Sequence, residues 1–123
     1  MATKKAKDIN QVLTLEEIEA VQDVTERTVP VPQWNGSVVV RSITKRQMRE
    51  IKRQSRDSDG NLQEELVEKA VFIAGLVEPT VDESVYEKLL DKSSAAIDTI
   101  TKAILDASHL TDEKQEEREK QFR

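Results

Sequence analysis

The sequence predicts a mainly α-helical fold: a small domain of four to five helices with an N-terminal β-hairpin. Three patterns carry this prediction, namely repeated helix-capping motifs, apolar residues at helical spacing, and one Asn-Gly pair between β-branched runs. A chain of 123 residues supports one core. We therefore expect a flexible leader over residues 1–12, a single α-rich domain over 13–110, and a charged tail over 111–123, helical or disordered.

Capping boxes mark the expected starts of three helices. In this motif a Ser, Thr or Asn side chain caps the first turn, and a Glu or Gln three residues later bonds back to it. The sequence offers three such pairs: Thr14 with Glu17, Thr44 with Gln47, and Asn61 with Glu64. They predict a first short helix ending near Asp23 and a second helix ending near Arg56.

The third helix is predicted to form the core. Its apolar residues are spaced 4, 3 and 4, at Leu66, Ala70, Ile73 and Val77. Three further apolar residues widen this stripe to more than a third of the circumference: Val67, Val71 and Ala74. Gly75 weakens the last turn and Pro79 ends the helix.

Two more helices are expected before the tail. Asp82 can cap a short helix that carries Val85, Tyr86, Leu89 and Leu90. After a break at Ser93-Ser94, a last helix carries apolar residues spaced 3, 4 and 3, at Ile97, Ile100, Ile104 and Ala107. Helix packing against helix is the expected core.

The hairpin is expected to pair strands at about residues 28–34 and 37–43. Asn35-Gly36 supplies two residues that tolerate positive φ, as a two-residue type I′ turn requires. That turn pairs Val31 with Val40 and Val29 with Ser42, and it gathers four valines on one face: Val29, Val31, Val38 and Val40. Pro30 and Pro32 on the other face favour an edge strand.

Composition argues against metal, cofactor and membrane roles. The chain has no Cys and one His, so neither a thiolate site nor a His cluster is expected. Residues 57–61 have the composition of a calcium-binding loop. With Gly60 at the sixth position of such a loop, the twelfth position holds Leu66 and not the carboxylate that calcium needs. No run of about eighteen apolar residues occurs, and we expect a soluble, intracellular protein.

No catalytic motif accompanies the titratable residues, so no enzyme activity is expected. His109 lacks a Ser-His or Glu-His spacing partner, and it fits a helix C-terminus, where a cation is favoured. The three glycines are far apart, which excludes a glycine-rich phosphate loop. Paired acids such as Glu16-Glu17 stand at helix starts, where the helix dipole explains them.

Charge is segregated along the chain. Residues 8–26 carry six acids and no base, residues 41–56 carry seven bases against Glu50, and residues 57–91 carry ten acids against two lysines. On a helix over 45–56, the bases form a cationic face, either partner-facing or able to neutralise phosphates. Opposite charge on separate segments also allows self-association.

Three residues are candidates for partner binding: Trp34, Met48 and Ile51. Trp34 adjoins the hairpin turn, where it either covers the core or serves as an interface anchor. Met48 and Ile51 are the whole apolar stripe of the second helix, which predicts a shallow helix with little core of its own.

The order of these features resembles the tail assembly chaperone family of long-tailed (siphovirus and myovirus-type) bacteriophages and prophages. The resemblance is carried by Ala20-Val-Gln-Asp23, by Val29-Pro-Val-Pro-Gln-Trp-Asn-Gly-Ser-Val-Val-Val-Arg41, by Ser42-Ile43-Thr44 opening a basic helix, and by Ala74-Gly-Leu-Val-Glu-Pro79. It covers about residues 13–110.

The resemblance implies a non-enzymatic factor in the host bacterial cytoplasm that needs no cofactor. Such proteins bind the tape measure protein, assist polymerisation of the tail tube protein around it, and are absent from the finished virion. Many also occur as a longer, frameshifted product. The alternative from the residues themselves is a small nucleic-acid-binding regulator that uses the basic helix 45–56.

Overall fold

The fold is mixed α/β rather than a helical domain with a hairpin attached, which corrects the expected fold class. The structure is a computed structural model and describes residues 9–109. Within them it has five α-helices, one 3₁₀ turn and a three-stranded antiparallel sheet of order β1-β2-β3. The helices are α1 (Leu15–Ala20), α2 (Lys45–Gln54), α3 (Glu64–Gly75), α4 (Glu83–Leu89) and α5 (Ser94–Ala107). The strands are β1 (Glu26–Val31), β2 (Gly36–Arg41) and β3 (Leu76–Glu78).

The third strand is the element that the sequence did not predict. The helix expected to run to Val77 ends at Gly75, and Leu76–Glu78 pairs with β2 beside an irregularity between Val39 and Val40. A strand of three residues is too short to show an alternating pattern. Its pairing makes the hairpin part of a sheet that contacts the helices directly.

The hairpin forms with a different turn from the expected one. Residues Pro32–Trp34 make a 3₁₀ turn, and Asn35 alone takes a left-handed conformation, with φ of 52°. Val29 therefore pairs with Val38 instead of Ser42, a slip of four residues. Because side chains alternate with period two, an even slip keeps the same residues on the same face. Three of the four expected valines are indeed buried, namely Val31, Val38 and Val40, and Val29 packs against them.

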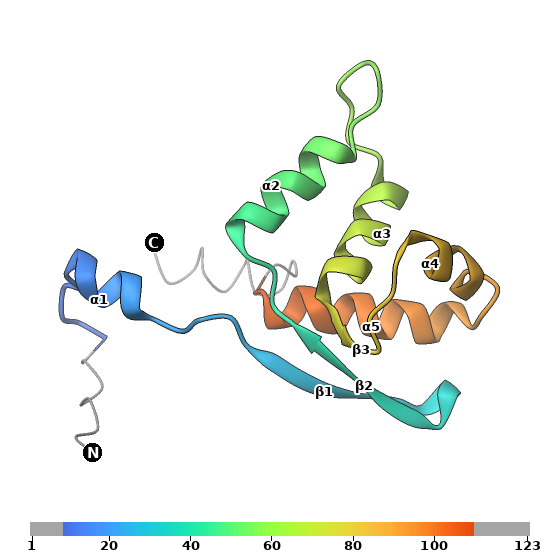
Figure 1. The fold of residues 1–123 in the computed structure, drawn as a ribbon, viewed down its shortest axis with the longest axis horizontal. Helices are drawn as coiled ribbons and strands as arrows, with labels where there is room; N and C mark the ends of the chain where they lie inside the picture. Colours follow the sequence, from blue (N-terminus) through green and yellow to red (C-terminus); the bar gives the residue numbers. More distant parts are fainter. Residues whose placement is uncertain (1–8, 110–123) are drawn as a thin grey trace.

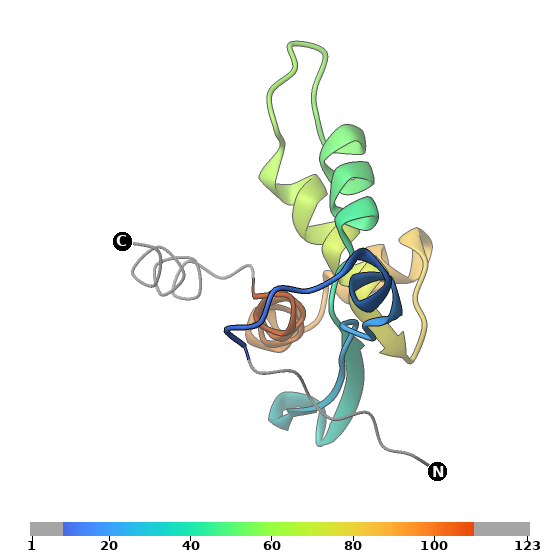
Figure 2. The same ribbon diagram turned by 90° about the vertical axis from the view of Figure 1, so that its left-hand side faces the viewer.

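The core lies between this valine face, α3 and α5. Figure 1 shows α5 lying along the sheet with α2 and α3 rising above it, and Figure 2 shows the same arrangement from the side. Ile100 and Ile104 of α5 are fully buried, as is Phe72 of α3. The ring of Phe72 meets that of Tyr86 edge to face, with centroids 5.2 Å apart.

Helix α3 buries only part of the wide apolar face that its spacing predicted. Its buried residues are Val71, Phe72 and Gly75, whereas Ala70, Ile73 and Ala74 are half-buried and Leu66 is exposed. The half-buried residues pack against the core on one side and leave a partly open apolar surface on the other. Both sides fit the wide apolar circumference of this helix.

Capping explains where most helices begin. The two threonine boxes are confirmed: Thr14 caps α1, and Thr44 caps α2 with bonds of 3.1 Å from Gln47 N–H to its hydroxyl and 2.9 Å from its own N–H to Gln47. Asp82 caps α4 as predicted. The third box is wrong, because the carboxylate of Asp57 accepts the N–H of Asn61, and α3 begins after Gln63 without a side-chain cap.

The predicted leader and tail fall mostly outside the described residues. Residues 9–12 of the leader carry no helix or strand, and the tail over 111–123 lies beyond the described range. Helix α1 stands apart in Figure 1, joined to β1 by an extended segment.

Candidate functional site

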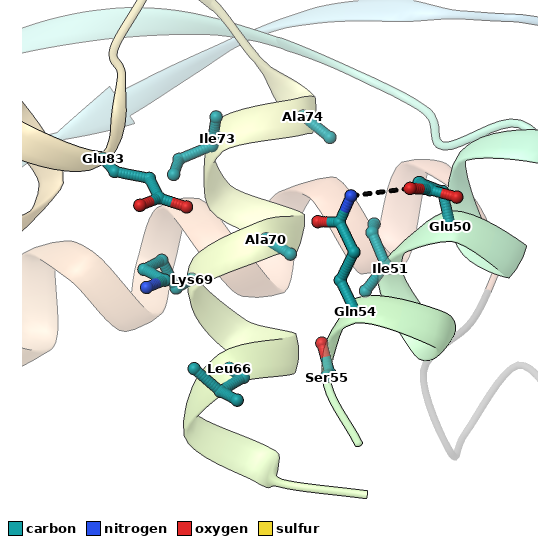
Figure 3. Close-up of a pocket in the computed structure, with 10 residues that line it drawn as sticks. All are labelled: Glu50, Ile51, Gln54, Ser55, Leu66, Lys69, Ala70, Ile73, Ala74 and Glu83. Atoms are coloured by element: carbon teal, nitrogen blue, oxygen red, sulfur yellow. Dashed lines mark hydrogen bonds between the residues drawn. The ribbon is translucent and has the colours of Figure 1, made fainter. Parts of the chain in front are cut away.

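A groove between α2 and α3 is a candidate binding site, because it combines an apolar floor with a charged rim. Its volume is about 300 Å³. Ile51 of α2 and Ala70, Ile73 and Ala74 of α3 supply its apolar floor. Figure 3 shows Ile51, Ala70 and Ala74 on the side where the two helices face each other, and Ile73 on the side of α3 toward Glu83. We call this site the α2–α3 groove.

Local structure on both sides of the groove fixes the two helices. The capping box at Thr44 starts α2, and the connection to α3 is closed by Gln63 N–H, which donates to the carbonyl of Ser55 at 2.7 Å. Ser55 is buried at the closed end of this connection and lines the groove. The helices are therefore held side by side where the groove forms.

The rim of the groove is charged. Glu50 and Gln54 border it on α2, while Lys69 and Glu83 border it on the side of α3 and α4. Glu50 accepts a hydrogen bond from Arg53 Nε at 3.0 Å and another from Gln54 Nε2 at 2.6 Å. These donors, Arg53 first, lower the pKa of Glu50 to about 2, so this carboxylate is ionised at any physiological pH.

A cationic hollow adjoins the groove along α2. It is lined by Lys45, Arg46, Arg49, Glu50 and Arg53. Glu50 borders both surfaces, so apolar floor and basic side chains are neighbours around the same helix. A ligand that suits both surfaces would present apolar groups to the floor and negative charge to α2.

The three sequence-predicted site residues are not brought together. Ile51 is only 5% exposed and belongs to the core, although it also forms part of the groove floor. Met48 is half-buried on α2. Trp34 is half-buried against the core in the 3₁₀ turn of the hairpin, which packs on α5 and lies at the other end of the molecule from α2 in Figures 1 and 2.

The sequence predicted the groove-lining residues of α3 as core residues and did not predict a groove there. Leu66, Ala70 and Ile73 belong to the predicted stripe, and the structure places them at or near the surface. The signal that could have found them is the width of the apolar face. A helix with two apolar faces serves two neighbours, or one neighbour and a ligand.

Residues 9–109 show neither a cluster of metal-binding side chains nor a membrane-spanning helix. No group of three or more His, Cys, Asp or Glu side chains within residues 9–109 is arranged to hold a metal ion. Over the same range, no helix combines the length and apolar character needed to cross a membrane.

Comparisons with models of known protein families, with curated proteins and with solved structures found no match for this chain. The groove and its charged rim are therefore the features of this chain that bear most directly on its function.

Proposed function

We propose that this chain is a non-enzymatic assembly chaperone that binds a helical segment of a larger partner in the α2–α3 groove. The observation that carries this proposal is the groove itself, an open, apolar floor bordered by charged side chains. Amphipathic helices bind in such grooves through one apolar face, whose residues are spaced at i, i+3, i+4 and i+7 and contact the groove floor. The resemblance to the tail assembly chaperones implies that the partner is a phage tape measure protein. Its long helices would be kept from aggregating until tail tube protein surrounds them.

The groove is better suited to docking than to chemistry. Its carboxylate Glu50 is held by Arg53 and Gln54, and its pKa is low, so it is a poor general base near neutral pH. The floor is aliphatic. This arrangement supports a binding role in the cytoplasm of a bacterial host, with release of the chaperone before the virion is complete.

The proposal is tested by co-expression with the tape measure protein. We expect the tape measure protein to stay soluble with the wild-type chain, and to aggregate when Leu66→Asp places a charge at the groove mouth. Leu66 is 37% exposed, so this change should spare the fold. Leu90→Asp is the matched control, at an exposed leucine that follows the end of α4 and lies outside the groove. A tape measure protein that aggregates equally with and without the wild-type chain would contradict the proposal.

A second candidate function rests on the cationic hollow. Lys45, Arg46 and Arg49 could neutralise nucleic-acid phosphates, although Arg53 is already paired with Glu50. This function predicts salt-sensitive retention on DNA that is abolished when Lys45, Arg46 and Arg49 are changed to Gln. Retention that is unchanged by these substitutions would exclude it.

A further inference from the structure

The N-terminal arm, defined as residues 9–25, exposes a row of large aliphatic side chains. Helix α1 buries none of its residues, and Leu15, Ile18 and Val21 are 70%, 54% and 50% exposed. Leu15 and Ile18 are three residues apart and so lie on one face of α1. Contiguous exposed apolar side chains of this kind mark an interaction surface.

A helix as short as α1 needs a surface to lie on. Its capping box is complete, with both hydrogen bonds between Thr14 and Glu17 in place. Isolated helices shorter than about 12 residues are nonetheless marginal in water, because their stability comes chiefly from packing. Helix α1 is therefore preformed for docking, and none of its residues is buried.

The floor of the α2–α3 groove complements the arm in polarity, and the cationic hollow beside it complements the arm in charge. From residue 9 to residue 25 the chain carries four acids, Glu16, Glu17, Glu19 and Asp23, and no Lys or Arg. The hollow beside the groove is lined by four bases and one acid. On α1, Glu16 and Glu19 are three residues apart and lie together along one side of the apolar face of Leu15 and Ile18, so both can face α2 when that apolar face meets the groove floor.

We propose that the arm of one molecule docks in the α2–α3 groove of a second copy of this chain. Leu15 and Ile18 lie on the groove floor, and Glu16 and Glu19 face Arg46 and Arg49. In the described part of the chain, Leu15 and Ile18 are exposed and the groove is open. This inference goes beyond the proposed function: the arm of a second copy would occupy the same groove as the partner helix proposed above, so the two would compete for it.

The contact is heterologous, because the arm and the groove are different surfaces. Each molecule that donates its arm still offers its groove, so assembly continues into rings or open chains. The contact that we propose uses one face of a short helix, so its strength has to be measured over a wide range of concentrations.

Sedimentation velocity across a range of concentrations tests the arm. We expect wild-type protein to pass beyond the dimer as its concentration rises, and Leu15→Ser/Ile18→Ser to stay monomeric, with association at least ~10-fold weaker. Leu90→Ser is the matched control, since Leu90 is 53% exposed and lies outside both arm and groove. A wild-type protein that is monomeric at every concentration, or equal weakening by Leu90→Ser, would overturn the proposal.

Mixing two variants tests the direction of the contact. The groove variant Arg46→Glu/Arg49→Glu keeps its arm, and the arm variant Leu15→Ser/Ile18→Ser keeps its groove; both change exposed residues, so both should fold. Neither should assemble alone, and the mixture should give a species of two chains and nothing larger. A mixture that remains monomeric would count against the arm-to-groove contact.

Charge reversal on both sides supplies an independent readout. Glu16→Arg/Glu19→Arg alone should abolish assembly, and its combination with Arg46→Glu/Arg49→Glu in one chain should restore it. Restoration is expected only when these charges face one another. If the combined variant stays monomeric while retaining its thermal transition, the proposed pairing is wrong.

Discussion

Gly75 allows α3 to approach α5 closely. A Cβ placed on Gly75 would lie 2.7 Å from Ile104 Cδ1 and closer still to Cγ2, in a fully buried region. Gly75→Ala should therefore destabilise the fold by about 1–3 kcal/mol through overpacking, measured as the free energy of unfolding in urea. Gly36→Ala is the matched control, because its Cβ would meet nothing closer than the Trp34 carbonyl oxygen at 3.9 Å. Equal stability of Gly75→Ala and wild type would show that the helices can move apart without cost.

Glu68 is the residue whose ionisation should oppose folding. Burial raises its pKa above the ordinary value of 4.5, and Glu64, Asp98 and Glu65 raise it further. Below about pH 4.5 the carboxyl is protonated in both the folded and the unfolded chain, so its ionisation does not lower the free energy of unfolding. As pH rises through the raised pKa of the folded state, stability falls.

Replacing Glu68 with Gln removes this effect. We expect Glu68→Gln to be more stable than wild type at pH 7, with the difference vanishing below about pH 4, in thermal unfolding followed at both pH values. Glu19→Gln on α1 is the control, since that helix buries no residue. A stability gain that persists unchanged at acid pH would point to packing rather than charge.

At the scale of elements, the two threonine capping boxes are a natural matched pair. Thr44→Ala should lower the free energy of unfolding by about 1 kcal/mol, because α2 packs on α3 and loses the bond from Gln47 N–H. Thr14→Ala removes the same bond from α1, which buries nothing. It should reduce helix content in circular dichroism without changing the unfolding midpoint. Equal effects on the midpoint would contradict the independence of α1.

Element starts were more predictable than element neighbours. Thr14, Thr44 and Asp82 act within their own first turns, so the sequence alone identified these helix starts. Asn61 failed because the Asp57 carboxylate, four residues earlier, competes for its N–H. The strand Leu76–Glu78 depends on pairing with Val39 and Val40, which lie far away in the sequence. Such pairing is tertiary, and no local pattern reveals it.

The groove was only half predictable for the same reason. Helical spacing grouped Leu66, Ala70 and Ile73 correctly on one face of α3. Which apolar face would meet α5 depends on Gly75, whose missing side chain admits Ile104. The sequence therefore grouped the α3 residues that line the groove and predicted them as core, and Ala70 and Ile73 do pack against the core while lining the groove.

At the scale of the whole molecule, the arm should be dispensable for folding. Thr25 and Ser42 exchange bonds at the start of the sheet, with Thr25 N–H to Ser42 Oγ at 3.1 Å and Ser42 N–H to the Thr25 carbonyl at 2.9 Å. A chain lacking residues 1–24 keeps these bonds and the entire core, so we expect an unchanged cooperative thermal transition. Loss of that transition would show that the arm contributes to the core.

The connection between α2 and α3 has a practical consequence. It projects from the top of the molecule in Figure 1, where Arg56 pairs with Leu62 and Asp57 accepts the N–H groups of Asp59 and Asn61 at 2.9 Å each. At its tip, an added Cβ on Gly60 would meet nothing within 4 Å. Lengthening such a closed loop costs little entropy. A fluorescent tag inserted after Ser58 would therefore report on this protein in living cells while leaving its sheet, its helices and both termini unchanged.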